Sequence, residues 1–235
     1  PIVALVGYTN AGKSTLFNRL TAAEVTAEDM LFATLDPTLR MIPTPAGRRV
    51  ILSDTVGFIS DLPTQLVAAF KATLEEVTEA DLLLHVRDSS HLDHKAQKQD
   101  VMDVLEELDV AGQGSDAKPI LEVHNKIDAL EDERRTGLFQ RCKDHPNEHI
   151  AVSASTGENC SQILEAIDIF LDSQQLLCLV TFPISDGALY ARLHNEGNVR
   201  KVDTTKDGQF EITVFLPTHE FNSLSKRDGT IIHRL

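Results

Sequence analysis

The chain has 235 residues, of which 36 are acidic and 22 basic, so its formal charge at pH 7 is −14. Hydrophobic residues make up 42% and charged residues 25%, which excludes the compositions of disordered proteins. The acidic balance argues against a nucleic-acid binder that works by bulk positive charge. The sequence has neither an apolar run of the roughly 18 to 20 residues that a membrane-spanning helix needs nor a signal-peptide pattern. Because the 3 cysteines also lack CxxC spacing, we expect a cytoplasmic protein without disulfides or zinc.

The first part of the chain alternates short apolar runs with longer amphipathic stretches, which is typical of a parallel sheet covered by helices. Short, almost wholly apolar runs suit strands buried on both faces. Strands are predicted at residues 2–6, 39–43, 50–53, 81–86, 120–124 and 149–152. Helices are predicted at 14–20, 65–77, 95–108 and 160–171, with a charge-dense helix start at 131–135. A Pro/Gly turn at 44–48 predicts an antiparallel edge hairpin.

After residue 171 the pattern changes to shorter elements. Strands are predicted at 176–184, 199–204, 210–216 and 230–233, and helices at 186–194 and 220–225. Their order, βαββαβ, is that of a small split βαβ domain. The predicted fold class is α/β: a domain at 1–172 with a mostly parallel six-stranded sheet, and a ferredoxin-like α+β domain at 176–235.

A complete GxxxxGK[ST] motif occupies residues 7–14, directly after a predicted strand and at the start of a predicted helix. Backbone N–H groups of such a loop, and the N-terminus of the helix, can point at phosphate oxygens. We expect Lys13 to reach the β- and γ-phosphates of a nucleotide and Ser14 to hold Mg²⁺. The predicted binding residues are Gly7, Tyr8, Thr9, Asn10, Ala11, Gly12, Lys13, Ser14 and Thr15.

A DxxG motif follows the predicted strand 50–53. Its residues are Asp54, Thr55, Val56 and Gly57. A carboxylate at the C-terminal end of a strand can hold Mg²⁺ through water, and Gly57 lets a backbone N–H approach the γ-phosphate. DxxG alone is a common turn, but behind a phosphate-binding loop it is the expected second phosphate contact.

An NKxD motif follows the predicted strand 120–124, at the edge where open α/β sheets bind ligands. Its residues are Asn125, Lys126, Ile127 and Asp128. The carboxylate of Asp128 can accept hydrogen bonds from the ring N–H and the exocyclic amine of guanine, a donor pair that adenine lacks. ATP would leave this carboxylate unpaired. We expect a further loop beside the base, formed by Ser153, Ala154 and Ser155.

Together these motifs resemble the Ras-like P-loop GTPase superfamily, and longer segments narrow the resemblance. The segments 7–14, 31–38 (LFATLDPT), 54–59 (DTVGFI), 61–63 (DLP) and 69–76 (AFKATLEE) are similar to the HflX family of ribosome-associated GTPases. The resemblance implies a first switch, in which the Thr34 hydroxyl joins Ser14 and Asp54 as a ligand of Mg²⁺. From the residues alone, Thr34 and Thr38 are equally plausible. The first switch consists of Phe32, Ala33, Thr34, Leu35 and Asp36.

The resemblance also implies GTP hydrolysis, binding to the large ribosomal subunit (rRNA and protein) and ribosome splitting or rescue, by a monomer. Members of the family carry an N-terminal domain and a helical linker ahead of the GTPase domain, so we expect that this chain, which starts at Pro1, lacks both. Catalytic roles are expected for Lys13, Thr34 and Gly57. Phe58 stands where many GTPases have a water-orienting glutamine. We therefore expect slow intrinsic hydrolysis or, alternatively, a GTP-gated ribosome-docking module with negligible hydrolysis.

Two other interpretations are weaker. A P-loop kinase is disfavoured by Asp128 and by the position of the DxxG motif. His85, His91 and His94 are close in sequence, but they lack the spacing of metal ligands.

Overall fold

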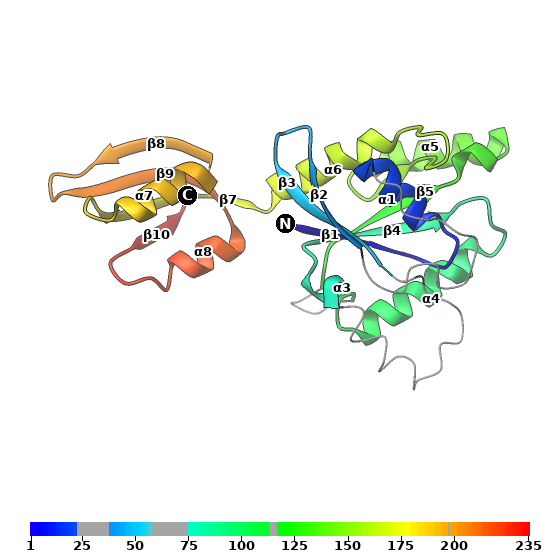
Figure 1. Ribbon diagram of the computed structural model, residues 1–235, viewed down its shortest axis with the longest axis horizontal. Helices are drawn as coiled ribbons and strands as arrows, with labels where there is room; N and C mark the ends of the chain where they lie inside the picture. Colours follow the sequence, from blue (N-terminus) through cyan, green and yellow to red (C-terminus); the bar gives the residue numbers. More distant parts are fainter. Residues whose placement is uncertain (23–37, 56, 58–74, 113–116, 197) are drawn as a thin grey trace. The chain divides into compact units, whose positions relative to one another are not determined.

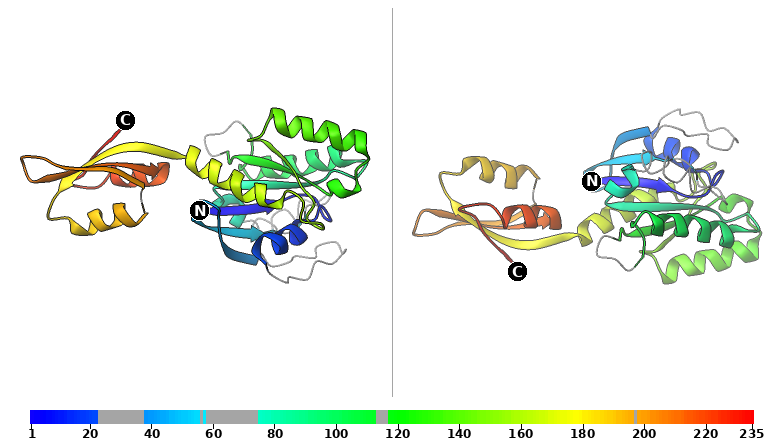
Figure 2. Two further views of the ribbon diagram at one scale, coloured as in Figure 1. Left: turned by 90° about the horizontal axis from the view of Figure 1, so that it is seen from above. Right: turned by 90° about the horizontal axis from the view of Figure 1, so that it is seen from below.

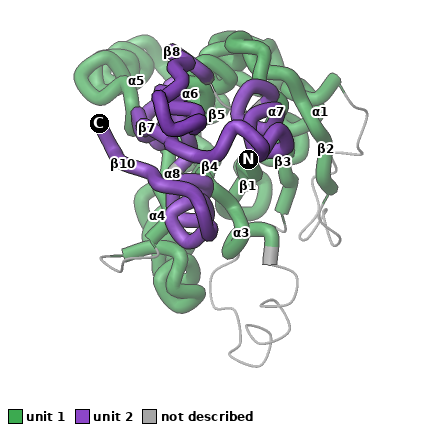
Figure 3. The backbone as a smooth tube through the Cα atoms, turned by 90° about the vertical axis from the view of Figure 1, so that its left-hand side faces the viewer, with its two compact units in different colours: residues 1–168 green, residues 169–235 purple. Residues whose placement is uncertain are grey.

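The computed structural model describes residues 1–22, 38–55, 57, 75–112, 117–196 and 198–235. These residues form two compact units, Pro1–Asp168 and Ile169–Leu235 (Figure 3). Within the described ranges, no helix combines the length and the apolar character needed to cross a bilayer.

A six-stranded sheet with the order β2-β3-β1-β4-β5-β6 forms the centre of the first unit (Figure 1). Strand β2 runs antiparallel to β3, and the other neighbouring strands are parallel. Each strand lies within two residues of a predicted one, so the mostly parallel sheet and the antiparallel edge hairpin are confirmed. The strands are β1 (Ile2–Val6), β2 (Thr38–Pro43), β3 (Arg49–Asp54), β4 (Leu82–Asp88), β5 (Ile120–Asn125) and β6 (His149–Ala151).

The helices of the first unit follow the strands in chain order. They are α1 (Lys13–Thr21), α3 (Glu75–Glu79), α4 (His94–Glu107), the 3-10 turn η1 (Ile127–Ala129), α5 (Asp132–Asp144) and α6 (Cys160–Ser173). Three helices of the sequence analysis are confirmed as α1, α4 and α6. Of the helix predicted at 65–77, residues 75–77 lie in α3, and the others are outside the described residues. Helix α5 has no buried residue, so no apolar spacing marks it, and the sequence analysis predicted only its charged start.

The core of the first unit is divided between the two faces of the sheet, because alternate residues of a strand point to opposite sides. Ala4 and Val6 of β1 pack with Val77 and Val101 on the face covered by α3 and α4. Figure 2 shows α1 on the opposite face from α4. There the ring of Phe17 is fully buried, which contributes roughly 1.5–3 kcal/mol to stability.

Asp168 of α6 holds the turn between β2 and β3. Its carboxylate accepts hydrogen bonds from the Thr44 hydroxyl at 2.6 Å and from the Ala46 N–H at 2.8 Å, and its carbonyl accepts one from Arg48 at 3.2 Å. Asp168 itself is only 6% exposed. Since a buried carboxylate is stable only with such partners, these contacts fix the edge hairpin to α6.

The second unit has the predicted element order βαββαβ and an antiparallel sheet with the order β10-β7-β9-β8. Alternate residues of β7 and β9, such as Val180 and Val214, are fully buried with Leu189 and Leu193 of α7. The helices therefore cover one face of this sheet. The elements are β7 (Gln175–Pro183), α7 (Gly187–Glu196), β8 (Asn198–Thr204), β9 (Gln209–Pro217), α8 (Thr218–Leu224) and β10 (Ile231–Arg234).

Candidate nucleotide-binding site

The sequence motifs meet at one edge of the first sheet. Strands β1, β3, β5 and β6 run in the same direction, so the segments that follow them leave the sheet at the same edge. Strand β1 lies between β3 and β4, and ligands of open α/β sheets bind at such a change of strand order.

Two glycines of the phosphate-binding loop lie against other backbone and side-chain groups. A Cβ atom at Gly7 would stand 2.2 Å from the carbonyl oxygen of Val86. Gly12 has a φ of +93°, and a Cβ there would stand 2.3 Å from the Asn125 amide nitrogen. Both positions therefore require glycine, and α1 begins directly afterwards at Lys13.

Lys13 is held inside the loop. Its ammonium group donates to the carbonyls of Gly7 and Tyr8, both at 3.0 Å, and the residue is 6% exposed. Burial lowers the pKa of Lys13 to about 8, against the opposing effect of the Asp54 charge. At pH 7 the group is therefore mainly cationic, so it can pair with a phosphate.

Gly57 of the DxxG motif lies against this loop. A Cβ atom at Gly57 would stand 2.9 Å from the Lys13 ammonium and 2.9 Å from the Thr9 methyl group. Asp54 and Thr55 are fully buried, and the Thr55 hydroxyl donates to the Leu5 carbonyl at 2.6 Å. Gly57 and Lys13 are therefore neighbours, as a shared phosphate contact requires.

Asn125 joins the first and the last loop of the site. Its amide nitrogen donates to the Ala11 carbonyl at 2.9 Å, and its amide oxygen accepts from the Ala154 N–H at 2.9 Å. Asn125 is 2% exposed. Both ends of this amide are thus bonded to protein, and Asn125 acts on a ligand through the loops that it holds.

Asp128 is the exposed member of the NKxD motif, whereas Ile127 is fully buried. A hydrogen bond from Ser153, together with one from Ser155, lowers the pKa of Asp128 below its ordinary value. The Ser155 hydroxyl donates to this carboxylate at 3.3 Å. Asp128 is therefore ionised at neutral pH and can accept hydrogen bonds from a base. Lys126 forms an ion pair with Asp88 at 2.7 Å.

Two arginines that the sequence analysis did not single out position the base-side loops. Arg19 of α1 donates to the carbonyls of Ala154 and Ser155, at 3.2 and 2.6 Å. Arg135 of α5 donates to the Ile127 carbonyl at 3.1 Å. Arg19 is 135 residues from Ala154, and no local pattern marks a contact of that span.

The oxygen donors proposed for Mg²⁺ are of the right chemical kind. Ser14 is the second residue of α1, and Asp54 ends β3. A hydroxyl and a carboxylate are the hard oxygen ligands that Mg²⁺ takes alongside water and phosphate. The first switch, Phe32 to Asp36, lies outside the described residues, as do Val56 and Phe58.

Among the described residues, the three histidines that are close in sequence do not form a group of potential metal ligands. His85 is fully buried in β4, where burial lowers its pKa to about 3, and His94 begins α4. Among the described residues, the group of potential ligand atoms within 4.8 Å of one another belongs instead to Glu122, His124 and His149. The sequence analysis missed this cluster, although Glu122 and His124 share one strand face and Glu122 pairs with His149 in register.

Comparisons with known proteins agree with this geometry. Residues 2–126 match the family described as "50S ribosome-binding GTPase". The chain is 50% identical over 205 residues to the GTPase HflX of Magnetococcus marinus, covering 87% of this chain and 45% of that protein. It is 42% identical over 236 residues to the GTPase HflX of Escherichia coli, covering 100% of this chain and 54% of that one. The chain thus spans about half the length of the relatives that it matches.

Solved structures share the fold of the first unit. A GTP-binding protein from Sulfolobus solfataricus in complex with GDP is 31% identical, with a TM-score of 0.56, and the match covers 72% of this chain and 52% of that chain. Era from Aquifex aeolicus, bound to GDP and AlF4⁻, is 27% identical, with a TM-score of 0.55, and the match covers 72% of this chain and 56% of that chain. The family match covers more than half of the chain and the motifs converge on one site, so the chain belongs to the 50S ribosome-binding GTPase family, in which its relatives are HflX GTPases.

Proposed function

We propose that this chain is the GTP-binding switch of a Mg²⁺-dependent GTPase that binds the large ribosomal subunit and promotes ribosome splitting or rescue in the cytoplasm. The observation that supports the proposal most is the double hydrogen bond of Asn125, which ties the phosphate-binding loop to the loop beside the base. A site built in this way would bring the loop for the phosphates and the loop for the base to the two ends of one nucleotide. Its relatives are named as HflX GTPases, and the family name supports the ribosomal partner.

The ionised carboxylate of Asp128 supports guanine as the base. Its low pKa leaves both oxygens as acceptors, and guanine presents two adjacent donors on one edge. Adenine lacks this pair, so binding ATP would leave an anion unpaired inside the complex.

For hydrolysis, Lys13 would pair with the β- and γ-phosphates, and the Gly57 N–H would donate to the γ-phosphate. Ser14 and Asp54 would hold Mg²⁺, with Thr34 as a further ligand, and the bound ion would neutralise charge that develops on the phosphates. Water attacks the γ-phosphorus and the bond to the bridging oxygen breaks, giving GDP and phosphate. Phe58 cannot orient that water by hydrogen bonding, so we expect a slow basal rate that the ribosome raises.

The proposed GTP-binding domain comprises residues 1–172, and the proposed ferredoxin-like domain comprises 176–235. Phe32 to Asp36 would be the first switch and Asp54 to Gly57 the second. GTP with Mg²⁺ would order Phe32 to Asp36 and the stretch from Phe58 onward, and hydrolysis would release them. We expect the chain to act as a monomer.

Single-turnover GTP hydrolysis, with and without purified 50S subunits, tests the reaction. We expect slow hydrolysis by the chain alone and acceleration by the subunits. If hydrolysis stays negligible in both samples while GTP binding persists, the chain is a GTP-gated docking module.

An exchange of base specificity tests the assignment of Asp128. The variant Asp128→Asn should lose affinity for GDP by at least about tenfold and gain affinity for xanthosine diphosphate, whose base presents an acceptor where guanine has its amine. Asp132→Asn, an exposed residue at the start of α5, is the matched control and should bind GDP normally. Unchanged specificity in Asp128→Asn would contradict the assignment.

A further inference from the structure

A pocket of about 190 Å³ lies in the first unit, among the ends of β4 and β5 and the helices α4 and α5. Its volume is below the roughly 300–1,000 Å³ of sites for drug-sized ligands, so it suits a small group. The polar residues that line it are Arg87, Ser89, His94, His124, Arg134 and Arg141. In the part of the chain that the structure describes, the lining includes no carboxylate.

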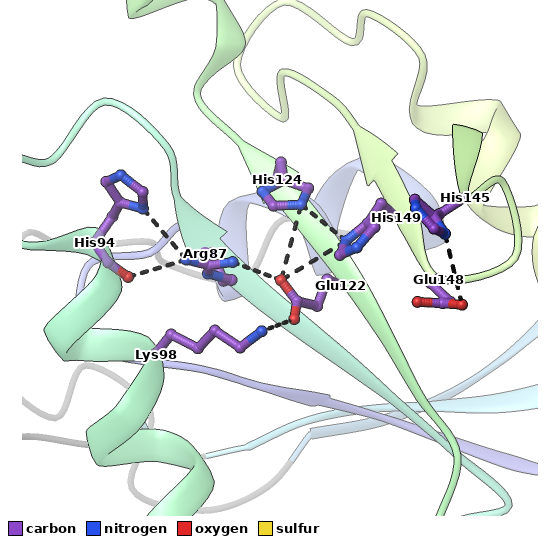
Figure 4. Close-up of polar contacts among 8 residues, drawn as sticks. All are labelled: Arg87, His94, Lys98, Glu122, His124, His145, Glu148 and His149. Carbon is purple, nitrogen blue, oxygen red and sulfur yellow. Dashed lines mark hydrogen bonds and ion pairs between the residues drawn. The ribbon is translucent and has the colours of Figure 1, made fainter. Parts of the chain in front are cut away.

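The positive charge of this pocket is only partly compensated. Arg87 donates to the Glu122 carboxylate, but Lys98 donates to the same carboxylate, so one anion serves two cations (Figure 4). Arg134 donates to the Ser89 carbonyl at 2.9 Å. Neither Arg134 nor Arg141 has an acidic partner within 4.0 Å among the described residues. A chain with a net charge of −14 thus places uncompensated arginines at one pocket.

Two residues of the pocket wall also contain buried polar atoms without a partner. The Ser89 hydroxyl and the Arg87 Nε have no hydrogen bond within the described ranges. The residues are 8% and 7% exposed. Such groups in native proteins are normally satisfied, by protein, water or a ligand, so the wall has unused donors.

Cationic side chains surround His94 on the wall of this pocket. The pKa of His94 is lowered by burial and then by Arg87, Arg134, Lys95 and Arg141. Glu122, His124 and His149 have the proximity of metal ligands, but a metal ion at Glu122 would meet the cations that already hold this carboxylate (Figure 4). The charges therefore favour an anion over a metal.

We propose that this pocket binds a phosphate-class oxyanion, either inorganic phosphate or the phosphate group of a small monoester. Guanidinium groups suit this ligand, because their planar donor pairs match two oxygens of a phosphate. Arg134 and Arg141 supply these donors from one helix, α5, and Ser89 supplies a hydroxyl from the end of β4. The proposal does not depend on GTP binding, since none of these residues belongs to the phosphate-binding loop.

Nuclear magnetic resonance of the whole 235-residue chain tests the proposal, with GDP and Mg²⁺ added to occupy the phosphate-binding loop. Inorganic phosphate is titrated at constant ionic strength while the Ser89 amide and the His94 imidazole are followed. We expect saturable shifts at both residues and a rise in the His94 pKa, because a bound anion stabilises the imidazolium. Shifts confined to residues 7–14 would mean that phosphate binds only at the nucleotide site, which overturns the proposal.

Arg141→Gln is the decisive variant, since Arg141 lines the pocket and lies on α5, a helix without buried residues, so we expect the substitution to leave the fold intact. It should weaken phosphate binding by about tenfold or more. Lys143→Gln removes the same charge from an exposed position on α5 and should bind phosphate normally. Equal binding by both variants, or equal binding of acetate and phosphate, overturns the proposal. Glycerol 3-phosphate, titrated in parallel, distinguishes a monoester from free phosphate by which of the two binds more tightly.

Discussion

Removing the side chain of Asn125 should loosen the whole nucleotide site, although this residue's amide is bonded to protein at both ends. The variant Asn125→Ala deletes one donor and one acceptor, each in a hydrogen bond of 2.9 Å. The partners that remain are the Ala11 carbonyl and the Ala154 N–H, in residues that are 1% and 2% exposed. Neither group can turn to water without moving its loop.

The expected cost follows from those two orphaned groups. A buried polar group left without its partner costs about 1–3 kcal/mol, so the variant should lose about 2–6 kcal/mol of local stability, with the lower values if the loops relax toward solvent. That is a large part of the roughly 5–15 kcal/mol that stabilises a domain. Asn125→Asp keeps an acceptor for Ala154 but turns an oxygen toward the Ala11 carbonyl, so it should be at least as damaging.

Hydrogen–deuterium exchange measured peptide by peptide is the suitable assay, because a chain with two units does not unfold in one simple transition. Amides of α1 should exchange about thirtyfold faster or more in Asn125→Ala, while peptides of the second unit stay unchanged as an internal reference. Asn147→Ala, at an exposed site before β6, is the control variant. Wild-type exchange of α1 in Asn125→Ala would refute the reasoning that these loops are held by one amide.

Three further predictions concern charge and packing. The pKa of Lys13 is about 8 before a phosphate is bound, so at pH 8 about half of these groups are neutral and a bound phosphate should protonate them. Calorimetry at pH 8 in buffers of different ionisation enthalpy should therefore detect uptake of about half a proton per GDP, and a measurement without proton uptake would contradict this prediction. His85 is neutral in the folded chain and takes up a proton below its ordinary pKa of 6.5 when unfolded, so stability should fall as the pH drops from 6.5 toward 3. At pH 5 the loss of stability due to His85 amounts to about 2 kcal/mol. The variant His85→Leu should therefore reduce the difference between the melting temperatures at pH 7 and pH 5. An unchanged difference would contradict a neutral His85 in the folded chain. A Cβ at Gly57 would lie 2.9 Å from the Lys13 ammonium and 3.0 Å from the Thr9 backbone, so Gly57→Ala should slow single-turnover hydrolysis by at least about tenfold; a wild-type rate would show that the segment shifts without consequence.

The strands and most helices could be predicted from the sequence, because burial on two sheet faces leaves short apolar runs and amphipathic helices leave a spacing of three and four. Helix α5 shows the limit of this method. With no buried residue, it contributes no apolar periodicity, and only its charged first turn indicates a helix. The edge hairpin was predictable for another reason, since its turn residues are local in sequence.

The candidate site was predictable where motifs are contiguous and unpredictable where contacts are distant. The loops at 7–14 and 125–128 have sequence patterns that reflect their backbone geometry. No sequence pattern marks the contact of Arg19, because the loop that it binds lies 135 residues further along the chain. The cationic pocket is a similar case, since Arg87, His124 and Arg141 come from separate elements and become neighbours only when β4, β5 and α5 are packed together.

The hydrogen bonds of Asn125 also bear on the order of events during protein synthesis. The bond to Ala11 spans 114 residues, and the bond to Ala154 spans 29 more. The phosphate-binding loop therefore leaves the ribosome that translates it well before β5 and β6, and it gains its last fixed partner only when those strands have been made. Contacts of such long range form late, because the intervening chain must first be ordered. A nascent chain that ends before residue 154 should therefore lack a closed nucleotide site, so nucleotide capture would be delayed until the sheet of the first unit is nearly complete.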